Sequence, residues 1–536
     1  MRDRYAYVIV GAGSSGCVLA DRLSADGRHS VLLVEAGPDD TSPLIRMPRG
    51  IGKLLAPGNP HVWDYQVTPS GNLPPETWLK GRAVGGSSSV NGMVYVRGAP
   101  DDYDGWEALG CPGWGWETMG RRFVELEDHE LGAAEWRGAG GPLKVSVHPS
   151  GNPLCEAVLA AGEAMGTPRI ADVNDPAALR SGGGMGYQPI TTWRGRRFSA
   201  ARAFLAQARK RPNLHVAPLT DARRIVFDGQ RASGLLVRDA RGERVVRADR
   251  EVILSAGAIH SPKLLQLSGV GPAALLSSLG IDVVADAPEV GRNLQEHRYL
   301  STQYRVRGES LNAAFGGLGL ARSVLAYLFR SRGALTHAAH EVGGFVRTRP
   351  GLDRPDAQIG VGLYSFNTDS GAVAIDPHPG MTILGYFTRP ESRGEIRIAS
   401  ADPDAAPSIH ANHFSAETDR TSAVSLFRWL RALGRQPALA DWIVAETQPG
   451  PRIETDEDVL ANAVGLGGTA YHVCGTCRMG PDEAAVLDPE LRVRGVESLR
   501  VVDTSIMPTI VSGNTNAPAM AIGLQAAELI LRAARP

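Results

Sequence analysis

The segment YHVCGTCRMG, residues 471–480, places His472 two residues before a Cys-x-x-Cys pair formed by Cys474 and Cys477. Side chains of these types could bind a metal ion, form a redox dithiol or move protons. A structural zinc site usually combines two paired ligand clusters, and this chain has one Cys-x-x-Cys. A redox dithiol is expected to open a helix after a strand near the N-terminus. Neither arrangement fits the segment well, so we predict no metal site and expect both cysteines to pack in the interior.

The histidine of this segment could instead act in catalysis as an acid–base group. A histidine with a pKa near neutral can accept the proton of a reacting hydroxyl group. A second polar side chain can hold the oxygen and stabilise the developing alkoxide charge. A lone histidine is more often a satisfied core residue, so this interpretation of His472 requires further signs of an active site elsewhere in the chain.

Residues 5–37 have the pattern of a dinucleotide-binding unit. YAYVIV predicts a buried strand, GAGSSG supplies Gly11, Gly13 and Gly16, a helix follows, and SVLLVEAG predicts a second strand that ends at Glu35. The first glycine permits a tight turn, the second lets the backbone approach a pyrophosphate, and the third lets helix and strand pack closely. The acidic residue can accept hydrogen bonds from a ribose. The motif alone does not separate NAD from FAD, and the alternative is a glycine-rich turn of an unrelated α/β domain.

Residues 81–106, GRAVGGSSSVNGMVYVRGAPDDYDGW, are predicted to form a loop because their glycines, serines and Asn-Gly pair disfavour a regular helix. The backbone amides of such a loop can approach an anionic or polar ring closely. A flexible surface loop is the alternative. Against it, apolar residues bracket the segment and indicate that it threads the interior: Val84, Val90, Val94, Tyr95 and Val96.

Taken in order along the chain, these segments resemble the glucose-methanol-choline (GMC) family of flavoprotein oxidoreductases. The resemblance runs the whole length of the chain, and so many motifs in this order are specific in combination. They are GAGSSGCVLADRL, EAGPDD, WDYQVTP, the glycine-serine loop, RRFSAARAFL, LSAGAIHSPKLLQLSGVGP, VGRNLQEH, PESRGEIRIASADP, YHVCGTCRMG and VVDTSIMPTIVSGNTNAP.

The resemblance implies FAD as the cofactor, with the glycine-serine loop along the flavin. In members with a histidyl-linked flavin, a histidine stands just before the asparagine that corresponds to Asn91. This chain has Val90 there, so we predict non-covalent FAD. The residues predicted to contact the cofactor are Gly11, Gly13, Ser14, Ser15, Gly16, Glu35, Ala36, Arg82, Val84, Gly86, Ser89, Asn91, Gly92, Met93, Val94, Ala222, Ala256, Tyr471, Asp503, Thr515 and Asn516.

The same resemblance implies a catalytic pair. In the family the acid–base group is the histidine of a segment like YHVCGTCRMG, here His472. A histidine or asparagine nine residues after the serine of D-x-S-x-x-P holds the substrate oxygen, and counting from Ser505 leads to Asn514. Asn516 is the second choice for that role. Asp503 is expected near the FAD phosphates or ribityl chain.

Because the cofactor motifs lie at both ends of the chain, the cofactor domain must be assembled from separated segments. We predict an α/β fold, α+β overall, with a Rossmann-like FAD-binding domain and a substrate-binding domain containing an antiparallel sheet. Strands are expected throughout 214–257 and at 357–364, 381–387 and 394–398. The predicted FAD-binding domain comprises 1–155, 195–298 and 465–536, and the substrate-binding domain comprises 156–194 and 299–464.

One position bears on the substrate. Choline-active relatives carry a glutamate two residues after the histidine of a segment like LQEH, and this chain has Tyr299 there. A tyrosine can make a cation–π contact but supplies no counter-charge. We predict a neutral aliphatic or aromatic primary alcohol oxidised to the aldehyde, with dioxygen or a quinone or other carrier as the electron acceptor. A choline-type dehydrogenase, a non-redox lyase of the hydroxynitrile type and an NAD-dependent Rossmann enzyme are the alternatives.

The composition is that of an ordinary globular protein. The 536 residues are 43% apolar and 21% charged, with a net charge of −1, which gives no reason to expect a nucleic acid or an anionic membrane as partner. Five scattered cysteines do not form a disulfide framework. We expect no signal peptide and no membrane-spanning helix, and therefore a cytoplasmic location compatible with peripheral membrane contact.

Overall fold

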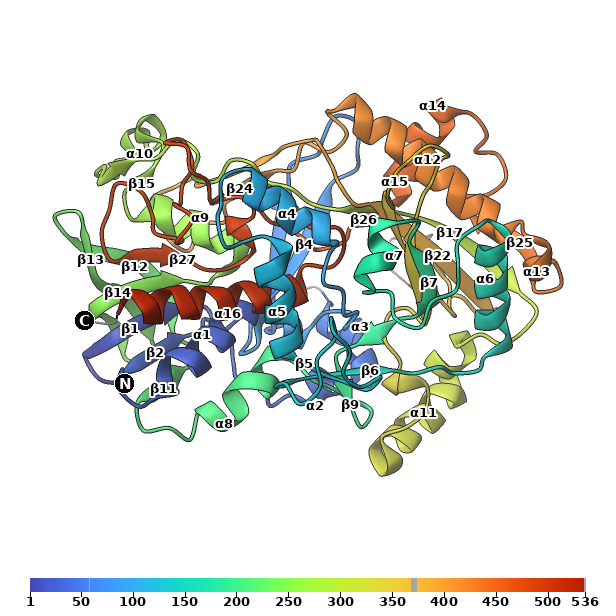
Figure 1. Cartoon of the computed structure of the whole chain (residues 1–536), viewed down its shortest axis with the longest axis horizontal. Coiled ribbons are helices and arrows are strands. Elements are labelled where there is room, and N and C mark those ends of the chain that lie inside the picture. The colour runs from blue at the N-terminus through green and yellow to red at the C-terminus, as the bar shows by residue number, and fades with distance from the viewer. Residues whose placement is uncertain (57, 368–373, 535–536) are drawn as a thin grey trace.

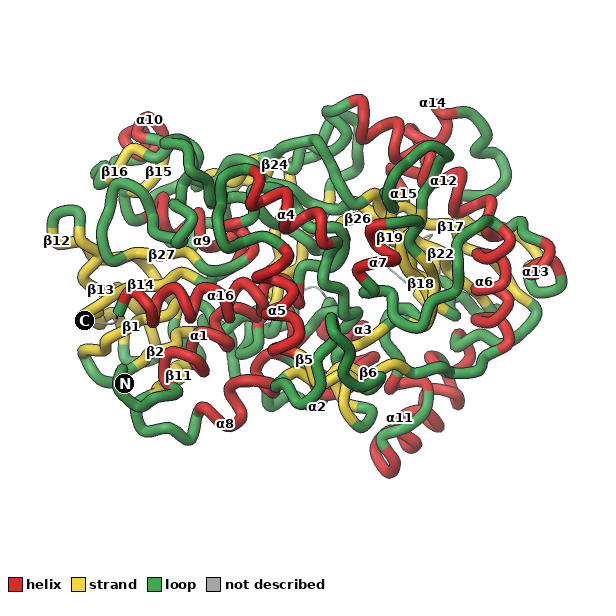
Figure 2. The backbone as a smooth tube through the Cα atoms, viewed as in Figure 1, coloured by secondary structure: helices red, strands yellow, loops and turns green. Residues whose placement is uncertain are grey.

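The computed structural model describes residues 1–56, 58–367 and 374–534. Two seven-stranded sheets form the framework of this part of the chain. Figure 1 shows them side by side, with both chain ends beside the first sheet. In Figure 2 the strands gather in two groups, with helices over their outer faces.

The core of the first sheet is parallel. The parallel strands are β11 (Leu214–Ala217), β2 (Val31–Val34), β1 (Arg4–Val10), β14 (Gly242–Leu254) and β27 (Leu499–Val501). The paired ends of β1, β2 and β14 are buried apolar runs, as expected for a sheet covered on both faces. The register pairs Val10 with Val34 and with Leu254, and Leu254 with Val501, so these strands end at the same level.

Two antiparallel strands extend this sheet. β12 (Asp221–Asp228) and β13 (Arg231–Asp239) form a hairpin that pairs with the first half of β14, whereas the second half of β14 pairs with β27. These strands account for the consecutive strands predicted in 214–257. They return the chain to the sheet edge at Leu254.

Two long helices join segments from opposite ends of the chain. Helix α1 (Ser14–Ser24) follows β1, and helix α16 (Asn516–Ala533) lies against it, as Figure 1 shows. A Cβ added to Gly523 would lie 3.0 Å from the Ser15 carbonyl oxygen, so the close approach of the helices depends on this glycine. The Ser15 hydroxyl also donates to the Ala519 carbonyl at 2.7 Å.

The second sheet is antiparallel throughout. Helix α12 (Glu417–Gly434) packs on it with an apolar stripe that includes Leu426, Phe427 and Leu430, and helix α6 (Pro153–Ala164) covers its far end. The strands, in spatial order, are β25 (Ile443–Gln448), β17 (Arg298–Val306), β22 (Gly380–Phe387), β19 (Ala357–Gly362), β18 (Val342–Val346) and β7 (Gly184–Tyr187), with β26 (Gly468–Thr469) beside the start of β17.

The predicted fold class is confirmed, but one of the strands predicted for the antiparallel sheet lies outside it. Strand β23 (Glu395–Arg397), predicted within the antiparallel sheet, instead pairs with β24 (Ser408–His410) in a separate ribbon, because Ile396 packs with Trp78 and Leu294. The glycine-serine loop contains a 3-10 turn at Gly86–Ser89 and is buried. The domain boundaries remain a prediction.

The end of that loop segment is helical, against expectation. Helix α4 (Pro100–Ala108) starts at a proline, which suits the first position of a helix. The Asp102 carboxylate accepts a hydrogen bond from the Ala99 amide at 2.8 Å and so fixes this start. Both signals were present in the sequence.

Candidate active site

A cavity of about 500 Å³ lies between the two sheets. The level ends of β1, β2 and β14 bring Gly11, Glu35 and Ser255 to one edge, where ligands bind in open α/β sheets. Tyr299 of β17 and Tyr386 of β22 form part of the opposite wall. Segments that are remote in sequence therefore meet around one chamber.

The glycines of the first motif have separable structural roles. Gly11 adopts a φ of 97°, and a Cβ there would lie 2.5 Å from the Ser255 carbonyl oxygen. A Cβ at Gly16 would lie 1.9 Å from the Gly11 carbonyl oxygen, so this residue serves helix–strand packing. At Gly13 the nearest atom is 3.8 Å away, which leaves open space beside the first turn of α1. No side chain caps that turn, so its N–H groups remain available to an anion.

Glu35 is held rigidly at the cavity wall. Its two carboxylate oxygens accept hydrogen bonds from the Ala12 and Gly37 amides, each at 2.9 Å. Burial raises the pKa of this carboxyl group to about 7, although the two amide hydrogen bonds oppose the shift. The carboxyl group is therefore oriented before any ligand arrives.

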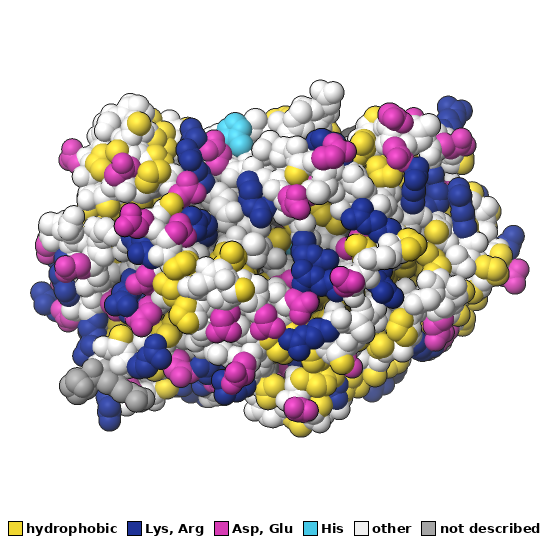
Figure 3. Space-filling view, turned by 45° about the horizontal axis from the view of Figure 1, so that its top comes forward, with side chains coloured by type: hydrophobic (Ala, Val, Ile, Leu, Met, Phe, Trp, Pro, Cys, Tyr) yellow, Lys and Arg dark blue, Asp and Glu magenta, His cyan; other side chains and the backbone are white. Residues whose placement is uncertain are grey.

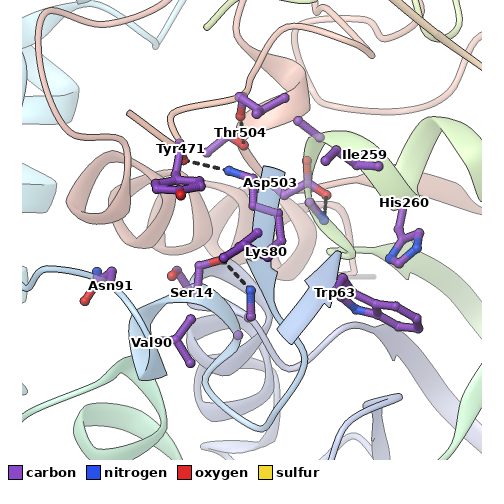
Figure 4. Close-up of a pocket in the computed structure, with 18 of the residues that line it drawn as sticks. Ser14, Trp63, Lys80, Val90, Asn91, Ile259, His260, Tyr471, Asp503 and Thr504 are labelled. Atoms are coloured by element: carbon purple, nitrogen blue, oxygen red, sulfur yellow. Dashed lines mark hydrogen bonds between the residues drawn. The ribbon is translucent and has the colours of Figure 1, made fainter. Parts of the chain in front are cut away.

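The glycine-serine loop presses against the first motif. The Gly85 amide donates to the Ala12 carbonyl at 2.7 Å, and a Cβ at Gly86 would lie 2.7 Å from the Gly13 Cα. Further along, the Asn91 side chain accepts hydrogen bonds from the Met93 amide and the buried Arg197 guanidinium, at 3.1 and 2.7 Å. Figure 4 shows Val90 and Asn91 on one side of the cavity and Trp63 with His260 on the other.

Most of the predicted site residues line this cavity. Nineteen of the twenty-three do so: Gly11, Gly13, Ser14, Ser15, Glu35, Ala36, Gly86, Asn91, Gly92, Met93, Val94, Ala222, Ala256, Tyr471, His472, Asp503, Asn514, Thr515 and Asn516.

Gly16, Arg82, Val84 and Ser89 do not line the cavity. The Arg82 guanidinium stacks over the Trp63 ring at 4.4 Å. The Val84 amide donates to the Pro38 carbonyl at 3.0 Å, and the Ser89 hydroxyl donates to the Val84 carbonyl at 2.9 Å. These contacts stabilise the cavity wall on the side that faces away from the cavity.

His472 is the centre of a directed hydrogen-bond chain. Its Nδ1 lies 3.0 Å from Nδ1 of His297, whose Nε2 lies 3.0 Å from the Thr388 carbonyl oxygen. Burial lowers the pKa of His297 to about 4, so its ring is neutral at neutral pH and has a single N–H. A carbonyl can only accept, which places that hydrogen on Nε2.

The tautomer of His472 follows from this assignment. Because Nδ1 of His297 is a bare acceptor, Nδ1 of His472 must carry the hydrogen, and Nε2 of His472 keeps its lone pair. Burial, followed by the nearby His297, lowers the pKa of His472 well below its ordinary value, so the ring is neutral. His472 thus presents a proton acceptor beside the cavity.

Hydrogen bonds also fix the orientation of the Asn514 side chain. Its Nδ2 lies 3.0 Å from Nε2 of His472, and its Oδ1 accepts from Nε2 of Gln358 at 3.0 Å. The Gln358 carbonyl oxygen in turn accepts from the Tyr386 hydroxyl at 2.5 Å. The amide donor of Asn514 therefore points at the bare nitrogen of His472.

The peptide bond between Tyr471 and His472 is held at both ends. The Lys80 ammonium donates to the Tyr471 carbonyl at 2.6 Å, as drawn in Figure 4, and the His472 amide donates to the Glu296 carboxyl group at 2.8 Å. Tyr471 has a φ of 63°, a left-handed conformation that costs a non-glycine residue free energy. Burial raises the pKa of Glu296 to about 8 and lowers that of Lys80.

Models of the GMC oxidoreductase family match residues 5–299 and 390–523. The chain belongs to the GMC oxidoreductase family. The predicted family is confirmed, and the protein is an FAD-dependent oxidoreductase that acts on alcohols.

Relatives with high similarity span nearly the whole chain. An "alcohol dehydrogenase [acceptor]" of Pseudomonas putida is 40% identical, over 98% of this chain and 96% of its own length. An "oxygen-dependent choline dehydrogenase" of Sinorhizobium medicae (strain WSM419) is also 40% identical, over 98% and 95%. Among solved structures, pyridoxine 4-oxidase from "Mesorbium loti" is 30% identical, with a TM-score of 0.87 over 98% of this chain and 99% of that one.

The nucleotide end of this GMC oxidoreductase fits FAD. The uncapped N–H groups of α1 can bind a pyrophosphate, the open space beside Gly13 lets the backbone approach it, and the Glu35 carboxyl group can accept from a ribose hydroxyl. These groups of the protein suit the pyrophosphate and the ribose of FAD, the cofactor that the family uses.

The two cysteines of residues 471–480 are free, buried thiols in this GMC oxidoreductase. Cys474 and Cys477 are free and fully buried, and burial raises the pKa of both thiols, which keeps them protonated. Within the described part of the chain, no group of three or more His, Cys, Asp or Glu side chains is arranged to hold a metal ion.

Sequence reasoning did not single out five residues at the centre of the site. Glu296 and His297 lie in the LQEH segment that contributed to the resemblance, so a signal existed for them. Lys80 belongs to none of the motifs that carry the resemblance. Gln358 and Tyr386 lie in the strands predicted at 357–364 and 381–387, where no pattern marks their side chains as part of a site. The contact of Lys80 with Tyr471 joins residues 391 positions apart, which no local pattern can predict.

Proposed function

We propose that this protein oxidises an uncharged primary alcohol to its aldehyde. The observation that carries the proposal is the bare Nε2 of His472 facing the Nδ2 donor of Asn514 at the wall of the cavity. One group accepts a proton and the other donates a hydrogen bond. Together they suit a hydroxyl group that loses its proton as negative charge develops on its oxygen.

Each residue then has a defined task. The substrate hydroxyl would replace the hydrogen bond between Nδ2 of Asn514 and Nε2 of His472, so that Nε2 accepts the hydroxyl proton and Nδ2 donates to the same oxygen. His297 accepts from Nδ1 of His472 and so supports the ring as it becomes positively charged. Bound FAD would supply the hydride acceptor for the alcohol carbon. The hydrogen bonds from Lys80 to Tyr471 and from His472 to Glu296 keep the imidazole ring of His472 in position for the proton transfer.

The lining next to His472 supports an uncharged substrate. It is aromatic and apolar, and burial lowers the pKa of His340 to about 4, so that ring is neutral. The acids among the described lining residues are Glu35, Asp221, Asp404 and Asp503. Those four lie in segments on the nucleotide side. The residues that surround the substrate end are Tyr299, Ala339, His340, Leu384, Tyr386 and Tyr471.

A choline-type substrate is less well supported by this lining. Tyr299, Tyr386 and Tyr471 could face a quaternary ammonium group, but the carboxyl groups close to them, Glu76 and Glu296, do not line the cavity. The 40% identity with choline dehydrogenases makes choline a necessary test compound. We also propose that FAD is bound without a covalent bond through residue 90, since a valine side chain cannot form one.

The deciding experiment follows the visible spectrum of the purified protein. The protein is mixed anaerobically with primary alcohols, with choline in parallel, and then opened to air. We expect an uncharged primary alcohol to bleach the flavin faster than choline does, and the rate of colour return separates oxidase from dehydrogenase. A flavin that stays oxidised with every alcohol would contradict the proposal and favour a non-redox lyase.

A further inference from the structure

Helix α11 (Gly317–Arg330) exposes large apolar side chains to solvent. The exposed fractions are 80% for Leu318, 54% for Leu325, 66% for Leu328 and 83% for Phe329. Leu318, Leu325 and Phe329 are spaced by seven and four residues, so they lie on one face of the helix, with Leu328 at its side. Single exposed apolar residues are common, but four on one helix form a patch that marks an interaction site.

Basic residues surround this patch without acidic partners. The sequence contains no Asp or Glu in 41–63, 176–220 or 310–340. Within the described part of the chain, six exposed arginines of these segments form no ion pair with a carboxylate: Arg46, Arg194, Arg196, Arg322, Arg330 and Arg332. The net charge of −1 therefore conceals a local excess of positive charge.

The three segments meet around α11. The buried side of the helix places Tyr327 close to Arg46 and Arg196. A Cβ at Gly195 would lie 2.1 Å from the Ser331 carbonyl oxygen, so the two loops touch. Next to this contact, Trp193 is 44% exposed. The patch is thus a continuous apolar and basic surface at the rim of the molecule, where Figure 1 shows α11 projecting.

We propose that this surface docks on an anionic lipid bilayer. An amphipathic helix with Leu and Phe on one side and Arg close by is suited to the boundary between headgroups and acyl chains. A second copy of this surface would oppose arginine to arginine, and a nucleic acid would leave the leucines without a partner. None of the described helices has the length and hydropathy to cross a membrane, so the contact is peripheral.

Docking here would bring the cavity close to the bilayer. The segments around α11 also supply Ile51, Leu55, Ala339 and His340, which line the cavity. Most of the face drawn in Figure 3 instead carries interspersed basic and acidic side chains. The proposal does not depend on the proposed substrate, because binding can be measured without catalysis.

The test is sedimentation of the purified full-length protein with vesicles. We expect it to bind vesicles of phosphatidylcholine with phosphatidylglycerol at low salt, and to bind pure phosphatidylcholine and high-salt samples much more weakly. The combined change Arg322→Gln, Arg330→Gln and Arg332→Gln should weaken binding by about 100-fold, since each charge near an anionic surface contributes about fivefold. The combined change Leu325→Ser, Leu328→Ser and Phe329→Ser should weaken it at least about tenfold.

Matched controls lie elsewhere on the surface. Leu109→Ser with Val283→Ser, and Arg224→Gln with Arg241→Gln, remove exposed apolar and basic residues outside the three segments and should leave binding unchanged. Equal flavin content and thermal stability would show that the variants are folded. The proposal would be overturned if the parent protein failed to bind anionic vesicles, or if the α11 variants bound them as well as the parent does. It would also be overturned if α11 proved to be the contact of a dimer of this chain.

Discussion

At His472, burial and hydrogen bonding favour the same protonation state. Desolvation keeps the imidazole neutral, and His297 directs its single hydrogen to Nδ1, so the ring lone pair is on Nε2, where it accepts from Asn514. Neither effect alone would suffice, because a neutral histidine with the other tautomer would present a donor to the substrate. The reactive nitrogen is therefore defined by a residue that does not line the cavity.

Replacement of His472 by alanine should leave FAD bound and slow anaerobic flavin reduction by about 100- to 10,000-fold, the range for a lost acid–base group. Stopped-flow spectra of the bound flavin measure this directly. Cys477→Ser is the matched control from the same segment and should reduce at the parent rate. Reduction of the alanine variant as fast as the parent would remove His472 from its proposed role.

The pH dependence should report the depressed pKa of His472. A base must be unprotonated, and burial places its pKa well below 6.5, so the rate of flavin reduction should stay level as pH falls through 6.5. The decline should begin only at lower pH. A midpoint above 6.5 in the anaerobic rate–pH profile would contradict this assignment.

Glu296 should carry a proton at neutral pH, since burial raises its pKa to about 8. The stabilising contribution of this raised pKa is complete below the unfolded pKa and is lost as pH rises through about 8.

Glu296→Gln, which mimics the protonated acid, should therefore keep activity and lose less stability than the parent as pH rises from about 4.5 to about 8. Thermal unfolding and flavin reduction measured across that pH range test this expectation. Glu296→Ala is the contrasting change, because it removes the acceptor of the His472 amide and should slow reduction. A parent and a glutamine variant with identical stability–pH curves would show that Glu296 is already ionised.

At the scale of elements, local patterns in the sequence predicted what depends on local geometry. The strand, turn, helix and strand of residues 5–37 follow from hydrophobic runs and glycine spacing, and the structure contains each of them. The pair of His472 and Asn514 was predicted from the resemblance, since no local pattern in the sequence links two residues that are 42 positions apart. Gln358 was missed because its contact with Asn514, 156 positions away, depends on how the second sheet meets the first.

The contact between the two glycine-rich loops yields an element-scale prediction. Gly86→Ala would place a Cβ 2.7 Å from the Gly13 Cα, at a φ of 53°, and should reduce both FAD retention and stability. Gly52→Ala is the control, since no atom lies within 4 Å of its added Cβ. Flavin-to-protein absorbance ratios and unfolding temperatures measure both effects, and an alanine variant at 86 with full flavin would contradict the packing argument.

At the scale of the whole molecule, the cavity is shared by both sheets. A ligand that binds only the folded state stabilises it, by about 3–4 kcal/mol at free concentrations of 100–1,000 times Kd. Because residues of both sheets line the cavity, FAD should stabilise both together.

Removal of FAD should therefore lower the unfolding temperature of the whole molecule, and added FAD should restore it. Calorimetry of the flavin-free and reconstituted protein measures the change. Acid precipitation should release the flavin into the supernatant, as expected without a covalent link at Val90. Flavin that stays in the precipitate would contradict the non-covalent proposal.

The packing of α16 on α1 also determines when, during biosynthesis, the nucleotide site can form. The Ser14 hydroxyl donates to the Asn516 side chain at 2.7 Å, so the wall of the nucleotide site is complete only when residue 516 has left the ribosome. At bacterial and eukaryotic elongation rates that interval lasts about 25–100 s after residue 14 emerges. During it the first glycine motif has no partner helix. Loading of the flavin is therefore a late event in the life of the nascent chain, after translation of nearly all of these residues.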